Sequence, residues 1–231
     1  YPESPEHHND LAATLGNLAN LYGDTDRSKE ALAAYQQAVT IRKQLVRKHP
    51  EQADYQNALA TTYSNLGNWL AMVGRLPEAE LAYQDALKIR QTLVEKYPHA
   101  RDYGLELAMI LTNFGHLLRD LDRAQGSLDY CRRAVAMLES MPASAGENAE
   151  KDRCLRNAHW GCAEALGRLG RHAEALPLWD RALALTPDDG RDLLRLGRAE
   201  ALARSGNHAR ATAEAQELVE SAQGFGPVLY R

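Results

Sequence analysis

Residues 79–86, AELAYQDA, are an almost unchanged copy of residues 31–38, ALAAYQQA, which lie 48 residues earlier. Other columns keep the same step: Leu11, Leu59 and Leu107; Asn17, Asn65 and Asn113; and the dipeptides Tyr1-Pro2, His49-Pro50 and Tyr97-Pro98. A repeat of this length is typical of small helical units that stack on their neighbours. Because such arrays expose extended surfaces, the repeat favours binding over catalysis.

Each 48-residue period predicts two helices. In the second period the apolar residues of the first helix are spaced by four, three and four, which is the stripe of an amphipathic helix: Leu59, Tyr63, Leu66 and Leu70. The turn at residues 74–77 places Gly at the end of one helix and Pro at the start of the next. The second helix begins with small residues, which allow close packing, and Tyr97-Pro98 ends it.

The regularity changes after residue 141. Residues 142–147, PASAGE, are small and aperiodic, so we expect a flexible loop over 142–152. Residues 153–231 predict two further repeats and the start of a truncated next helix. The expected organisation is therefore three repeats in 1–141 and two in 153–231, an all-α array of about five helix-turn-helix units.

Composition excludes several classes of function. The chain has 231 residues and a net charge of −4, whereas nucleic-acid binding normally needs a marked basic surplus. No run of 18 apolar residues predicts a membrane span. The three cysteines, Cys131, Cys154 and Cys162, form no C-x-x-C pair, so we expect buried thiols in a reducing cytoplasm.

Motifs for chemistry are missing as well. The eight histidines form no H-E-x-x-H pattern, and the sequence has neither a serine elbow nor a recognisable Cys–His pair. Tyr35 and Tyr83 suit packing better than catalysis. We therefore expect no enzyme activity, no metal and no cofactor.

The repeated residues resemble the signature of the tetratricopeptide repeat (TPR) family. Those that carry the resemblance are Leu66-Gly67, Leu70, Gly74, Ala79, Tyr83 and Ala86. Residues 15–22, LGNLANLY, are similar to kinesin-light-chain-type repeats, and the long period closed by His-Pro or Tyr-Pro is similar to arrays attached to bacterial serine/threonine kinases. The resemblance implies a right-handed α-α superhelix, a TPR solenoid, with a concave groove. No kinase motif lies in this chain, so an attached kinase would lie outside it.

Two rows of polar side chains are the candidate binding residues. They are Asn17, Asn20, Asn65, Asn68, Asn113 and His116. Stacking would align them along the inner surface, where an amide can donate to and accept from a peptide backbone. The resemblance implies that Asn at matching positions grips bound peptides. The alternative is that these side chains bond a neighbouring helix and help the repeats to stack.

Arg119, Trp160 and Arg168 lie on the same predicted face and suit a preference for acidic and apolar groups. We therefore expect a scaffold that binds an extended peptide segment of a partner protein, as a fragment of a larger signalling protein. The alternative is a structural spacer, or a module that self-associates through its repeat ends.

Overall fold

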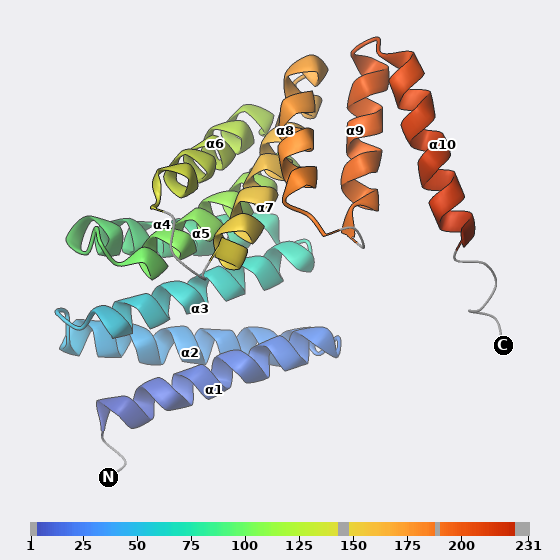
Figure 1. Cartoon of the computed structure of the whole chain (residues 1–231). Helices are drawn as coiled ribbons and strands as arrows, with labels where there is room; N and C mark the ends of the chain where they lie inside the picture. Colours follow the sequence, from blue (N-terminus) through green and yellow to red (C-terminus); the bar gives the residue numbers. More distant parts are fainter. Residues whose placement is uncertain (1–3, 143–147, 188–189, 225–231) are drawn as a thin grey trace. The chain divides into compact units, whose positions relative to one another are not determined.

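The computed structural model describes residues 4–142, 148–187 and 190–224, which form ten α-helices and no strand (Figure 1). The helices are α1 (Pro5–Asp24), α2 (Ser28–Lys48), α3 (Ala53–Met72), α4 (Leu76–Lys96), α5 (Arg101–Asp120), α6 (Ala124–Ser140), α7 (Asn148–Arg168), α8 (His172–Ala184), α9 (Asp192–Arg204) and α10 (His208–Gly224). The predicted all-α class is confirmed.

The contacts divide the chain into two compact units, Tyr1–Leu117 and Leu118–Arg231, called unit 1 and unit 2 below. The boundary lies near the end of α5, not in the expected 142–152 loop. Residues 148–152 of that loop instead form the first turns of α7, where Glu150 favours the positive end of the helix dipole. Residues 143–147, and the truncated helix expected from residue 226, lie outside the described residues.

The turns inside the five helix pairs of the described chain share one backbone geometry. Each has a residue with φ between 57° and 86°: Asp26, Gly74, Asp122, Gly170 and Gly206. The next residue donates its N–H to the carbonyl five residues earlier, over 2.8 Å from Arg75 to Leu70 and 2.9 Å from Asn207 to Leu202. This is the Schellman helix end, which satisfies carbonyls that the helix leaves free.

Aromatic contacts join successive repeats in unit 1. Tyr35 of α2 packs on Trp69 of α3 with ring centroids 5.9 Å apart, and Tyr83 of α4 packs on Phe114 of α5 at 6.0 Å. Both tyrosine rings are buried, as their position in the repeat predicts. The 48-residue step in the sequence is therefore a repeated interface in space.

Two buried arginines belong to the same interfaces. Arg42 donates to the carbonyl of Ala58 over 2.7 Å and to the hydroxyl of Thr62, and Arg90 pairs with Glu106. Burial lowers the pKa of both guanidinium groups, but their ordinary values are so high that both stay charged. The second helix of each pair therefore docks by an aromatic ring and, seven residues later, a buried cation.

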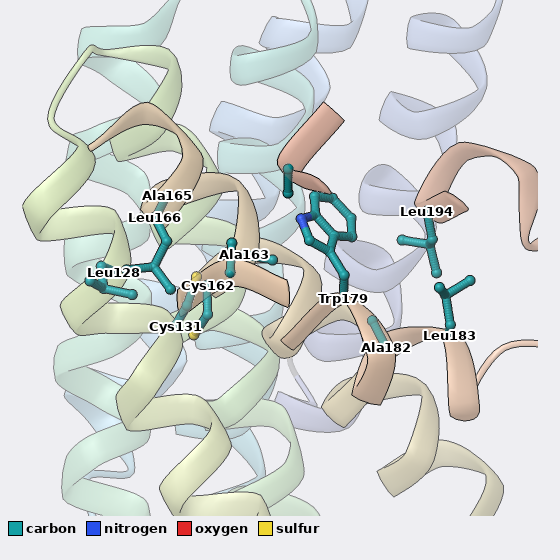
Figure 2. Packing of buried hydrophobic residues seen from close by; sticks show 12 residues of the cluster. Leu128, Cys131, Cys162, Ala163, Ala165, Leu166, Trp179, Ala182, Leu183 and Leu194 are labelled. Carbon is teal, nitrogen blue, oxygen red and sulfur yellow. The ribbon is translucent and has the colours of Figure 1, made fainter. Parts of the chain in front are cut away.

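The core of unit 2 lies between α6, α7, α8 and α9 (Figure 2). Cys131 occupies the column of Tyr35 and Tyr83, and its side chain meets that of Cys162 from α7. All three cysteines are buried and unbridged, as expected. In the next column position the large residue returns as Trp179, which packs against α9.

His159 makes the stability of unit 2 sensitive to mild acid. Its ring in α7 is buried, and Nδ1 has no hydrogen-bond partner among the described residues. Burial and Arg181 lower the pKa of His159, and Glu139 opposes this only in part. The folded state therefore takes up its proton only below the pKa of about 6.5 of an unfolded histidine.

We expect the contribution of His159 to stability to be complete above about pH 6.5 and to fall by at most about 1.4 kcal/mol per pH unit below it. Urea unfolding of the wild type and His159→Leu at about pH 7.5 and pH 5.5 measures this. The wild type should lose more stability than the variant on acidification. Equal losses would contradict the assignment.

Candidate functional site

A groove of about 760 Å³ runs between α7 and α9 in unit 2. One wall carries Trp160, Ala163, Glu164, Gly167 and Arg168 from α7. The other carries Leu193, Leu196, Gly197, Glu200, Ala201 and Arg204 from α9. Trp179 of α8 lines the groove as well, as do Arg119 and Asp120 at the end of α5. First helices of successive repeats thus form both walls.

One end of the groove is apolar. The 36-residue step that relates these two repeats places Trp160 level with Leu196. Leu193 and Leu196 are each 60% exposed, although leucines on amphipathic helices are normally turned to the core. Two exposed leucines beside an indole form a surface that suits an apolar side chain.

The other end is basic. The same step places Arg168 level with Arg204, and His172 lies nearby in the lining. Arg204 pairs with Glu200 over 2.8 Å, whereas Arg168 is exposed and has no ion-pair partner among the residues the structure describes. Eight residues of α7 separate Arg168 from Trp160, which is about 12 Å along the helix. A single segment can therefore reach both ends.

Arg119 lies at the groove but is already paired. Its guanidinium group pairs with Glu164 of α7 and, over 2.9 Å, with Asp120. Glu164 thereby neutralises the middle of the groove and leaves the positive charge to Arg168 and Arg204. Three of the residues expected from the sequence, Arg119, Trp160 and Arg168, therefore line one groove.

The asparagine rows lie in unit 1 and make internal hydrogen bonds. Asn20 accepts a hydrogen bond from the Tyr35 hydroxyl. Asn68 accepts one from Tyr83 over 2.5 Å and a second from the amide of Asn113 over 3.0 Å. The second bond joins α3 to α5, which is the stacking use considered as the alternative. Asn17 is exposed and Asn65 half-buried, and neither side chain has a hydrogen bond in the described chain.

The tyrosines are strong, permanent donors in this arrangement. Burial, with a smaller effect of Asp24, raises the pKa of Tyr35 to about 12, and burial raises the pKa of Tyr83 well above its usual value. Both hydroxyls keep their protons at any physiological pH. Asn20 and Asn68 therefore satisfy groups that would be costly to leave unpaired beside the core.

A sequence profile described as tetratricopeptide repeat matches residues 11–51, 59–101 and 107–141, and a second profile of the same description matches residues 157–181. The chain belongs to the tetratricopeptide repeat family. The matched segments cover the helix pairs that begin with α1, α3 and α5 and the turn between α7 and α8. No curated protein sequence matches the chain significantly.

Solved TPR structures share the fold at low sequence identity. BtubC (BKLC) from P. vanneervenii is 18% identical with a TM-score of 0.72, over 99% of this chain and 87% of that one. A putative kinesin light chain with nearly identical TPR-like repeats, from Podosopora anserina, is 17% identical with a TM-score of 0.66, over 97% and 99%. YrrB, a TPR protein with an unusual peptide-binding site, is 20% identical with a TM-score of 0.55, over 89% and 84%. The resemblance to kinesin-light-chain-type repeats is therefore confirmed at the level of the fold.

The sequence expectations missed the two leucines of this TPR groove. Three leucines, at 193, 194 and 196, fall within one turn of α9, and only Leu194 is buried. One apolar stripe cannot bury all three, so the excess was a visible signal of an exposed apolar surface.

Other expected absences concern only the described residues. No group of three or more His, Cys, Asp or Glu side chains there could hold a metal ion. No helix in that part of the chain is both long and apolar enough to cross a bilayer.

Proposed function

We propose that the groove between α7 and α9 binds an extended segment of a partner protein that carries a bulky apolar side chain and an acidic group. The TPR fold in general supports a protein-interaction scaffold. The observation that carries the proposal is the polarity of the groove, with Leu193 and Leu196 exposed at one end and Arg168 unpaired at the other. The peptide-binding site named for YrrB adds support by analogy.

The spacing of the two ends defines the ligand. Arg168 lies about 12 Å from the level of Trp160, and an extended chain rises about 3.3 Å per residue. The acidic group should therefore follow or precede the apolar anchor by about four residues. Arg204 is held by Glu200, so Arg168 provides the charge that selects the ligand, and a carboxylate can bind it bidentately.

Unit 1 offers a second, weaker contact for such a segment. The amides of Asn17 and Asn65 lack partners in the described chain, so they can still bond a peptide backbone. The unbridged, buried cysteines suit a reducing compartment such as the cytoplasm. The role as a spacer would require no such groove.

Selection of peptides from a random library on the immobilised chain tests the proposal. We expect enriched sequences to combine Leu, Phe or Trp with Asp or Glu about four residues away. Against the best peptide, Leu196→Asp and Arg168→Glu should each raise the Kd by at least about tenfold, which is about 1.4 kcal/mol.

Matched controls separate the groove from general effects of charge. Arg210→Glu changes the charge by the same amount at an exposed site on α10, and Leu81→Asp changes an exposed leucine on α4. Both should bind as the wild type does. A library that yields no shared motif, or a motif that binds the two groove variants unchanged, would overturn the proposal.

A further inference from the structure

The outer face of α1 is exposed at positions that later repeats bury. This face is defined by Asp10, Leu11, Thr14, Leu18 and Leu21, which lie on one side of the helix. Leu11 is 50% exposed and Leu21 is 57% exposed. The residues 48 positions later, Leu59 and Trp69 of α3, are only 5% and 4% exposed. The sequence thus places core residues on a surface.

The helix that buries the same face of α3 shows what this surface fits. α2 places Tyr35 on Trp69 and extends Arg42 to the Ala58 carbonyl and the Thr62 hydroxyl. α4 repeats the arrangement on α5, where Tyr83 contacts Phe114 and Arg90 pairs with Glu106. In both cases an aromatic residue and an arginine seven positions later dock on the face together.

α1 has both sockets for that arginine. Thr14 occupies the column of Thr62, and its hydroxyl donates to the Asp10 carbonyl over 2.9 Å, as Thr62 donates to Ala58 over 3.0 Å. Asp10 occupies the column of Glu106, and it is exposed. The face therefore offers a hydroxyl and a carboxylate where a docked helix would bring its cation, beside leucines where it would bring its ring.

We infer that the outer face of α1 is a docking surface for a repeat helix of a partner protein, one that carries an aromatic residue and, seven positions later, an arginine. A second copy of this chain does not fit. Among its second helices only α2 and α4 have this pair, and both are already packed within unit 1; the corresponding pairs are Cys131 and Leu138 in α6, Trp179 and Thr186 in α8, and Ala215 and Ala222 in α10.

The probe is a peptide of the sequence of residues 76–98, which carries Tyr83 and Arg90. Gln84→Glu, joined to Lys88 by a lactam, keeps it helical, because both positions are exposed in α4 and lie one turn apart. The peptide carries a fluorescent label, and its anisotropy is followed as the intact chain is added. We expect saturable binding.

Two substitutions test the geometry. Leu21→Glu in the chain should raise the Kd by at least about tenfold, because it places a charge where the aromatic ring packs. Arg90→Met in the peptide should raise the Kd by at least about fivefold on the wild-type chain but hardly at all on Asp10→Ala, because the two changes remove the same contact.

Two controls exclude other sites. Leu81→Glu alters an equally exposed leucine of α4 and should leave binding unchanged, and Leu196→Asp does the same for the groove of unit 2. Absence of saturable binding by a peptide that is helical in solution would overturn the inference. Equal binding by the wild type and Leu21→Glu would overturn it too, since the peptide would then bind elsewhere or displace α4.

Discussion

Replacing Trp179 with alanine is expected to lower the free energy of opening of α7, α8 and α9 by about 3–5 kcal/mol. The indole belongs to the core cluster of unit 2 and is buried, and no other side chain of that cluster has its volume (Figure 2). Its ring fills the space above Gly197, so alanine would leave a cavity that spans the contact between α8 and α9. Because each helix pair contacts mainly its neighbours, the loss should be local rather than global.

Native-state hydrogen exchange measures this loss helix by helix. Amides of α7 to α9 should exchange faster in the Trp179→Ala variant, while amides of α1 to α3 keep the wild-type rates. Urea unfolding alone is less suitable, since arrays of repeats can unfold in steps. Uniform acceleration along the whole chain would contradict the local role of Trp179.

Two glycines provide a matched test of the same packing. A Cβ added at Gly197 would lie 2.5 Å from the Trp179 ring, whereas one added at Gly167 would meet nothing within 4 Å. Gly197→Ala should therefore destabilise α8 and α9 by about 1–2 kcal/mol, after its gain in helix propensity is subtracted. Gly167→Ala should stabilise α7 by about 0.5–1 kcal/mol. Both residues line the groove, so a difference between them reports on the ring.

The helices and turns were predictable because they depend on local signals. The spacing of Leu59, Tyr63, Leu66 and Leu70 is a property of one helix, and it predicted α3 directly. Gly74 at φ 78° marks a turn that the sequence alone indicates. Such features need no knowledge of the neighbouring helix.

The candidate site was predictable only in part, because exposure depends on what packs alongside. Trp160 and Arg168 were expected on one face, and they do line one groove. Whether Leu193 or Leu194 turns to the core is decided by the position of α8 and α10 against α9, which the spacing of leucines does not specify. The Asn68 amide likewise bonds both Tyr83 and Asn113, and the second bond comes from a residue 45 positions away.

Charged residues were the least predictable part of the core. Glu214 of α10 is buried, yet it pairs with Arg195 over 3.1 Å and with Arg198 over 2.7 Å, both from α9. In a sequence, all three resemble a solvated helix surface. The last helix of the described chain is thus attached to α9 by ion pairs as well as by apolar contacts. A buried charge is compensated only by a partner on another helix, so it becomes recognisable only when the helices are placed.

Replacing Arg90 with alanine is expected to destabilise the contact between α4 and α5 by about 3 kcal/mol. The side chain is 1% exposed, donates to Thr61 over 2.8 Å and pairs with Glu106. Its removal leaves both a cavity and a carboxylate without its counter-charge. Glu106 is 35% exposed, so water compensates part of the lost pairing and keeps the cost near the lower end for buried pairs.

Arg42 is the matched comparison, because it lies 48 residues earlier in the same place but has only neutral partners. Arg42→Ala removes the same atoms without leaving an unpaired charge, so it should cost less than Arg90→Ala by about 1–2 kcal/mol. Adding Glu106→Ala to Arg90→Ala should recover that difference, as measured by hydrogen exchange in α3 to α5. Equal costs at the two arginines, with no recovery in the double variant, would show that packing rather than the ion pair holds these repeats together. The expected inequality would show that unit 1 uses one docking geometry with two kinds of polar partner, of which the outer face of α1 has both.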